Sequence, residues 1–218
     1  MIIWTCMRTG GTVLINHLTI NDTQWRKKLP SEFPELGLTK GEYGKIWNYE
    51  HLNPNNPGQW NNWIDAVTKY NLYTKIYNRP WPDSFYKTIS SANQNHVILY
   101  RENSFDRLLS HWFRTECLSL DKKSIDLKPI DVHLCIRWEH SARTHFAKVV
   151  ETVADYQAIS YEDIFIRKDL EKMDKVFPGI DHSLLVKSER YDYWPLYERM
   201  ENYQELREEV SKLPTFHF

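Results

Sequence analysis

The sequence predicts an α/β fold organised around a parallel β-sheet, and three observations lead to this prediction. Short apolar runs with strand character alternate along the chain with segments of helical periodicity, the order expected for a parallel sheet covered by helices. One of these runs, residues 96–100, is continuously apolar, as in a strand that is buried on both faces. The 218 residues, of which 41% are hydrophobic and 26% charged, suffice for a single globular domain over residues 1–218 with a sizeable core.

The first strand, turn and helix lie at the start of the sequence. The apolar run Ile2–Trp4 is followed by Arg8–Thr12, which contains two adjacent glycines, and then by the apolar-periodic segment Val13–Leu18. This order predicts a buried strand that passes through a tight turn into a helix.

The glycine turn has the composition of an anion-binding site. Gly10 and Gly11 permit backbone conformations that side chains forbid, and they would leave successive N–H groups directed into one concavity at the positive end of the helix dipole. Such places bind phosphate and related anions. Arg8 adds a positive charge, and Thr9 and Thr12 add hydroxyl groups. On this segment alone, an ordinary turn beside a solvated arginine stays open as the alternative.

A loop-rich region precedes the second predicted strand. Glycines, prolines and asparagines gather in residues 37–58, and we expect this region to lie on the substrate side, since loops on a scaffold often carry function. The elements predicted next are a helix that includes Trp60, Trp63, Ile64 and Val67, a strand over 71–77 that stops at Asn78-Arg79-Pro80, and a short helix over 84–91.

A second unit of strand, turn and helix begins at residue 96. The strand 96–100 ends in Arg101, and the apolar residues of 105–113 then repeat at helical spacing. Asn103 or Ser104 is the expected N-cap of this helix. Since ligands of open α/β sheets bind beyond the carboxyl ends of the strands, we expect both units to face the same crevice.

The rest of the chain continues the alternation. The pattern predicts a polar loop over 117–129, a long helix over 132–153, a strand over 156–160, a helix that opens at Tyr161 and continues over 168–177, and a final helix over 203–213. No internal repeat, low-complexity tract or linker divides the sequence.

Composition and charge exclude several classes of function. The net charge is −1, so no global field would recruit nucleic acid, and a basic site has to be local. The three cysteines, Cys6, Cys117 and Cys135, are irregularly spaced, as expected for free thiols in a reducing compartment. No apolar run approaches the length of a transmembrane helix, and no secretory signal is recognisable. We therefore expect a cytoplasmic protein without membrane insertion, and its oligomeric state stays open.

Four stretches of the sequence resemble the sulfotransferase family that uses 3′-phosphoadenosine 5′-phosphosulfate (PAPS). Met7–Thr12 resembles the family's 5′-phosphosulfate loop. Ile98–Ser110 resembles its 3′-phosphate motif, with a spacing closest to the bacterial, trehalose-sulfotransferase-like branch that acts on carbohydrates. Ser160–Asp163 resembles the Tyr-Glu-Asp element near the adenine, and Glu201–Leu206 resembles the late Asn-Tyr-x-Glu-Leu helix. The four matches span nearly the whole chain in the family's order.

This resemblance implies a fold, a co-substrate and a set of binding residues. The fold would be the three-layer α/β/α sulfotransferase fold, similar to P-loop NTPases, with a central parallel sheet. The reaction would move a sulfuryl group from PAPS to an acceptor hydroxyl without a metal ion, leaving adenosine 3′,5′-bisphosphate (PAP) as product. The residues implied for the 5′-phosphate and the sulfuryl group are Arg8, the backbone of Thr9, Gly10, Gly11 and Thr12, and the Thr12 hydroxyl. Arg101 and Ser110 are implied for the 3′-phosphate, and Tyr161 for the adenine.

The catalytic residues follow the family less closely. Cytosolic relatives carry Lys-Thr-His where this chain reads Lys75-Ile76-Tyr77, so the lysine is retained and Tyr77 replaces the histidine. Carbohydrate-acting relatives use a glutamate near a Gly-Glu-aromatic sequence, which Glu42 matches within Gly41-Glu42-Tyr43. The resemblance therefore implies Glu42 as general base, with Glu35 second, and Lys75 as a contact to the transferring sulfate. A solvated glutamate and an exposed lysine are the alternatives for these positions.

The acceptor itself cannot be predicted from the sequence. Four aromatic residues near the proposed base lead to the hypothesis that they stack on a sugar or an aromatic ring: Tyr43, Trp47, Trp60 and Trp63.

Other functions explain the motifs less well. A P-loop nucleotide kinase or NTPase expects Gly-x-x-x-x-Gly-Lys-Ser/Thr and an apolar strand that ends in aspartate, whereas this strand ends in Arg101. A catalytically inactive PAPS-binding protein remains open because of Tyr77. Hydrolases are not indicated, since no Gly-x-Ser-x-Gly occurs. No recognised zinc-ligand spacing relates His133, Cys135, His140 and His145.

Overall fold

Four parallel strands form the sheet, in the order β2-β1-β3-β4. The strands of this computed structural model are β1 (Ile2–Thr5), β2 (Thr74–Tyr77), β3 (His96–Tyr100) and β4 (Tyr156–Ser160). The structure describes residues 1–218 except 22–52, 54, 71–72, 120–123, 186–193 and 217. The predicted α/β class with a parallel sheet is confirmed.

The strand register brings the carboxyl ends of the strands to one edge of the sheet. Thr5 at the end of β1 lies opposite Tyr77 of β2 on one side and Leu99 of β3 on the other. On the far side of β3, Tyr100 pairs with Ser160, the last residue of β4. The segments that follow the four strands therefore emerge next to one another.

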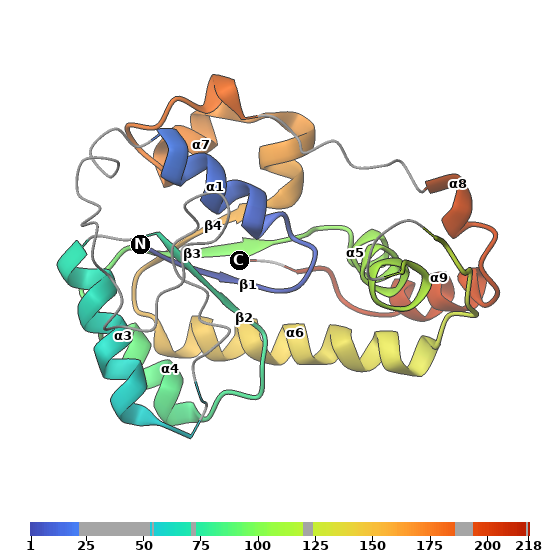
Figure 1. Cartoon of the computed structure of the whole chain (residues 1–218), viewed down its shortest axis with the longest axis horizontal. Helices are drawn as coiled ribbons and strands as arrows, with labels where there is room; N and C mark the ends of the chain where they lie inside the picture. The colour runs from blue at the N-terminus through green and yellow to red at the C-terminus, as the bar shows by residue number, and fades with distance from the viewer. Residues whose placement is uncertain (22–52, 54, 71–72, 120–123, 186–193, 217) are drawn as a thin grey trace.

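Helices cover both faces of the sheet, which gives the three layers visible in Figure 1. One face, with Ile2, Trp4 and Ile98, packs against α3 (Pro57–Tyr70), α4 (Asp83–Ser90) and α6 (Val132–Thr152). The other face, with Ile3, Val97 and Leu99, packs against α1 (Gly11–Asn21) and α7 (Leu170–Val176). The alternating side chains of β1 thus enter two separate apolar cores, which explains why its run has no polar face.

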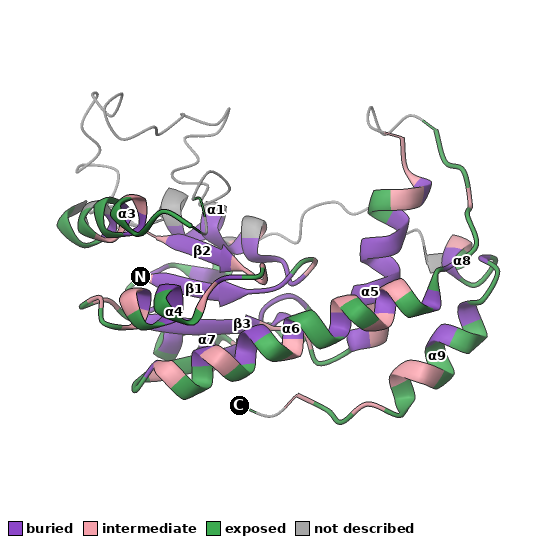
Figure 2. Cartoon of the chain, turned by 90° about the horizontal axis from the view of Figure 1, so that it is seen from below, coloured by how far each residue is buried: buried purple, intermediate pink, exposed green. Residues whose placement is uncertain are grey.

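A third apolar cluster lies beyond the carboxyl edge of the sheet. It joins α5 (Ser104–Trp112), the π-helical segment η3 (Phe113–Cys117), α8 (Trp194–Tyr197) and α9 (Tyr203–Ser211) to the first part of α6. Figure 2 shows that α5 is buried along nearly all of its length. Asn103 is its N-cap, because the Asn103 side chain accepts a hydrogen bond from the backbone N–H of Asp106.

One predicted helix is interrupted. The sequence pattern favoured a helix from Tyr161 that continues over 168–177, but the structure has a π-helical segment, η4 (Asp163–Arg167), and a separate α7. Lys168 between them adopts a left-handed conformation with a φ of 51°. Asp169 then caps α7 by accepting a hydrogen bond from the backbone N–H of Lys172. The local cap therefore prevails over the apolar spacing that runs through this segment.

The part of the chain that the structure describes contains no helix with the length and apolar character needed to cross a membrane.

Several histidines are buried in the cores around the sheet. His145 of α6 forms a hydrogen bond between its Nδ1 and the Tyr86 hydroxyl at 2.9 Å, and burial lowers the pKa of His145 to about 3. His17 of α1 lies 3.3 Å from His182, Nε2 to Nδ1, and burial, followed by the neighbouring His182, lowers the pKa of His17 to about 4. Both imidazoles are therefore neutral in the folded protein at pH 7.

Because the pKa values of these histidines are lowered, we expect the protein to become less stable as the pH falls from 7.5 to 5.5. An imidazole with a lowered pKa in the folded state binds fewer protons there than in the unfolded chain, so its contribution is complete above its ordinary pKa and is lost as the pH falls toward the folded value. We expect about 1 kcal/mol of lost free energy of unfolding per buried imidazole at pH 5.5. Urea denaturation at both pH values measures the loss.

A matched pair of variants assigns this effect. His145→Gln should make the pH dependence shallower, whereas His133→Gln, at an exposed position of the same helix, should leave the pH dependence unchanged. Equal slopes in the two variants would contradict the assignment.

Candidate functional site

The turn between β1 and α1 passes through two left-handed residues. Arg8 has a φ of 64° and Gly10 a φ of 79°, and the former is unusual for a residue with a side chain. Thr9 is buried between them; its hydroxyl donates a hydrogen bond to the Cys6 carbonyl at 2.9 Å and also contacts the Thr5 hydroxyl. The Thr9 side chain thus closes the turn, and only its backbone is placed to serve a ligand.

The two adjacent glycines of the turn differ in what they permit. A Cβ atom on Gly10 would lie 2.5 Å from Cε2 of Phe165 and 3.0 Å from Cδ2 of Tyr161. A Cβ atom on Gly11 would lie 3.6 Å from Thr5, which is ordinary van der Waals contact. The turn therefore requires glycine at position 10, because the backbone is left-handed and the segment that follows β4 packs directly against it.

Arg8 and Ser110 meet across the sheet edge. The Nε of Arg8 donates a hydrogen bond to the Oγ of Ser110 on α5 at 3.1 Å, and Ser110 is buried. The family resemblance implies these two residues for opposite ends of the nucleotide, so the structure brings together two predicted groups that were expected to act apart.

His111, next to Ser110 on α5, was not among the predicted site residues. Its ring packs edge-on against Trp138 with a centroid distance of 4.4 Å. Burial, followed by the nearby Arg107 and Arg8 guanidinium groups, lowers the pKa of His111 to about 4. Its position beside Ser110 was the only signal in the sequence that could have indicated this proximity to Arg8.

Arg101 and Tyr161 form a second predicted pair. The Arg101 guanidinium lies over the Tyr161 ring at 4.6 Å from the ring centroid, within the range of a cation–π interaction. Ion pairs at 3.7 Å join Arg101 to Asp106 and to Glu162. Arg101 therefore pairs with a carboxylate of the following helix and with one of the segment after β4, whereas the adjacent Glu102 pairs with Arg167.

Tyr161 connects this pair to the turn. Its buried ring faces Arg101 and also lies where a side chain on Gly10 would project. Five predicted residues from the ends of three strands and from α5 consequently gather at one edge of the sheet. We call them the strand-edge cluster: Arg8, Gly10, Arg101, Ser110 and Tyr161.

The strand-edge cluster lies at a topological switch point of the sheet. β1 and β3 are neighbours, yet β1 leads into α1 on one face and β3 leads through α5 to α6 on the other. Open α/β sheets bind ligands at such points, beyond the carboxyl ends of the strands.

A buried group of charges anchors α5 behind this cluster. Glu139 of α6 pairs with Arg107 of α5 and, at 2.8 Å, with Arg143, and the side chains of Arg107 and Glu139 are 2% and 0% exposed. Ser104 in the first turn of α5 also donates a hydrogen bond to Glu139, at 2.9 Å. Glu139 therefore holds two successive parts of α5 on α6 and fixes the helix that presents Ser110.

Lys75 and Tyr77 are paired at the end of β2. The Nζ of Lys75 donates a hydrogen bond to the Tyr77 hydroxyl at 2.7 Å, and Lys75 is largely buried. Tyr77, at the position where the resemblance led to a comparison with histidine, thus fixes the side chain of Lys75. Glu42 and Glu35 lie outside the described residues, as does the side chain of Thr12.

Two of the aromatic residues proposed for the acceptor have another role. Trp60 and Trp63 of α3 are 1% and 6% exposed and belong to the core between α3, α4 and the sheet. The hypothesis that they stack on an acceptor is therefore wrong, because their rings are already covered by protein. Tyr43 and Trp47 lie outside the described residues.

The cysteine and histidine residues considered for zinc do not converge. Cys135 is buried in the third apolar cluster, where burial raises the pKa of its thiol to about 12, while His133 is exposed. His145 is hydrogen-bonded to Tyr86 instead. Across the described ranges, no three histidine, cysteine, aspartate or glutamate side chains are grouped as they would be around a metal ion.

Comparison of the chain with protein-family models and with curated proteins finds no match.

From the packing of the turn we expect effects of different size for its two glycines. Gly10→Ala should lower the free energy of unfolding by about 2 kcal/mol or more, since a left-handed alanine is strained and its methyl group overlaps Phe165 and Tyr161. Gly11→Ala, with room for the methyl group, should change it by less than about 1 kcal/mol. Urea denaturation of both variants tests this, and similar losses would contradict the packing described for the turn.

Proposed function

We propose that this chain is a PAPS-dependent sulfotransferase, which moves a sulfuryl group to the hydroxyl of a carbohydrate or another small acceptor. The observation that supports this most strongly is the strand-edge cluster. Two arginines, a buried serine hydroxyl and a buried tyrosine ring surround a glycine turn at the switch point of the sheet.

The groups of the strand-edge cluster suit a nucleotide with an anionic group at each end. Guanidinium groups offer planar sets of N–H donors that match phosphate and sulfate oxygens, and an aromatic ring can stack on a base. Arg8 and the backbone amides of Thr9–Thr12 would hold the 5′-phosphosulfate. Arg101 and Ser110 would hold the 3′-phosphate, and Tyr161 would contact the adenine.

The contact between Arg8 and Ser110 is compatible with this assignment. The two anionic groups of PAPS are attached to one ribose, so the residues that bind them have to lie within reach of each other. A hydrogen bond of 3.1 Å between Arg8 and Ser110 places them so.

The proposed chemistry depends on preorganised donors and on a base. PAPS supplies the activated sulfuryl group when it is bound. Arg8 and the amides of the turn would stabilise the negative charge on the transferring group and on the leaving oxygen. Lys75, held by Tyr77, would contact the transferring sulfate. Glu42, or Glu35 as second candidate, would accept the proton of the acceptor hydroxyl.

Calorimetry tests the binding part of this proposal. We expect the protein to bind PAP in preference to ATP, with or without Mg²⁺. Arg8→Ala and Arg101→Ala should each weaken PAP binding about 10- to 100-fold, since each removes a charge-assisted contact. Arg137→Ala, at an exposed position of α6, is the control and should leave the affinity unchanged. Tighter binding of ATP with Mg²⁺ would favour a kinase or NTPase and overturn the proposal.

A substitution at Glu42 tests the catalytic part. Glu42→Gln should preserve PAP affinity and slow sulfuryl transfer about 100-fold or more, the usual effect of losing a general base. Glu151→Gln, at an exposed position of α6, should transfer at the wild-type rate. Normal turnover of Glu42→Gln would show that the base is another residue. A wild-type protein that binds PAP but transfers to no hydroxyl acceptor would favour the inactive binding protein.

A further inference from the structure

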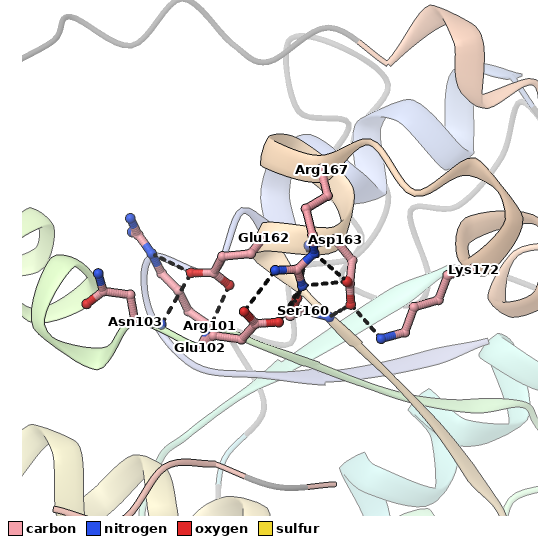
Figure 3. A network of polar contacts seen from close by, with 8 residues as sticks. All are labelled: Arg101, Glu102, Asn103, Ser160, Glu162, Asp163, Arg167 and Lys172. Carbon is pink, nitrogen blue, oxygen red and sulfur yellow. Dashed lines mark hydrogen bonds and ion pairs between the residues drawn. The ribbon is translucent and has the colours of Figure 1, made fainter.

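Two glutamates, one after β3 and one after β4, each bond to residues at or after the end of the other strand (Figure 3). Glu102, which follows β3, reaches the segment after β4: it accepts a hydrogen bond from the Ser160 hydroxyl at 2.8 Å and pairs with Arg167. Glu162, which follows β4, reaches back: its carboxylate accepts from the backbone N–H groups of Glu102 at 2.9 Å and Asn103 at 3.3 Å. The ends of the two strands are thus joined in both directions.

Of these two carboxylates, that of Glu162 forms an ion pair with a residue of the strand-edge cluster. Glu162 lies 3.7 Å from the Nε of Arg101, and the two amides that it binds follow Arg101 directly in the chain. Both side chains are largely covered, with 11% of Arg101 and 15% of Glu162 exposed. Glu102 points away from Arg101 toward Arg167.

We infer that Glu162 is a positioning residue that holds Arg101 in place for the 3′-phosphate of the nucleotide. This inference rests on the proposed function and deepens it, because it assigns the preference for a 3′-phosphorylated nucleotide to a residue that does not touch the phosphate. Glu162 fixes the backbone on which Arg101 is carried, between the end of β3 and the N-cap of α5.

The hydrogen bonds of Glu162, not its charge, are the basis of this role. A carboxylate beside Arg101 offsets part of the positive charge that would attract a phosphate, so charge alone would weaken anion binding. The same carboxylate satisfies two backbone N–H groups just before α5, where a negative group is also favourable to the helix. The two N–H groups bond to different oxygens of the carboxylate, so a glutamine, with one amide oxygen, can accept from one of them, whereas an alanine leaves both without this acceptor.

The Tyr161 ring also has packing partners that do not involve Glu162. Its ring packs against Phe165 at a centroid distance of 4.9 Å and against the turn at Gly10. Loss of the Glu162 carboxylate should therefore affect the contact of Arg101 with the 3′-phosphate and spare the contact of Tyr161 with the base.

The experiment compares two nucleotides that differ in the 3′-phosphate. Calorimetry with PAP and with adenosine 5′-monophosphate is carried out on the wild type, Glu162→Ala, Glu162→Gln and the control Glu102→Ala. We expect Glu162→Ala to weaken PAP binding about 10-fold and to change binding of adenosine 5′-monophosphate less than about 3-fold. Glu162→Gln should have a PAP affinity between those of Glu162→Ala and the wild type, and Glu102→Ala should stay within about 3-fold of the wild type for both nucleotides.

Hydrogen exchange provides a readout that needs no nucleotide. The amides of Glu102 and Asn103 should both exchange faster in Glu162→Ala than in the wild type, and Glu162→Gln should keep one of the two protected. Unchanged exchange in Glu162→Ala, an unchanged preference for PAP, or equal losses for both nucleotides would each overturn the inference while leaving the proposed function intact. A wild type that binds neither nucleotide would overturn the proposed function itself.

Discussion

The left-handed backbone at Gly10 is the constraint on which the strand-edge cluster depends. At this point the chain leaves β1 so close to Tyr161 and Phe165 that a methyl group would overlap their rings. The turn after the first strand is thereby packed against the segment after the last strand, although β3 lies between them in the sheet. From this turn Arg8 reaches Ser110, and the guanidinium of Arg101 lies over the same Tyr161 ring.

Around the Gly10 turn, hydrogen bonds and ion pairs of polar side chains fix the relative positions of elements that apolar packing does not specify alone. The hydroxyl of Thr9 closes the turn, the carboxylate of Glu162 ties the end of β3 to the end of β4, and Glu139 ties α5 to α6. Each of these groups bonds to backbone or to a charged partner in a buried or half-buried place. Such bonds contribute little net stability but penalise other arrangements strongly. The geometry of the cluster is therefore specified by hydrogen bonds and the sheet beneath it by apolar burial.

The sequence was most informative where one residue pattern has one physical meaning. Strands buried on both faces appear as unbroken apolar runs, and β3 was predicted with its bounds; α5 was predicted with Asn103 as one of two candidate caps. The convergence of Arg8 and Arg101 followed from the rule that ligands bind where parallel strands end, and Tyr161 was indicated by the family resemblance. Contacts that depend on side-chain direction could not be predicted. The bond between Arg8 and Ser110, the burial of Trp60 and the break at Lys168 are set by tertiary packing and local caps, which a linear pattern does not encode.

The buried charges behind α5 determine how strongly dissolved salt acts on the electrostatics near the strand-edge cluster. Arg107 and Arg143 both pair with the Glu139 carboxylate, and Arg107 is 2% exposed whereas Arg143 is 19% exposed. Arg107 is close enough to the cluster that its guanidinium acts on the titration of His111. Dissolved ions cannot surround a charge that water does not reach. Salt therefore weakens the effect of Arg107 on His111 less than it weakens the effect of an exposed lysine or arginine on its surroundings.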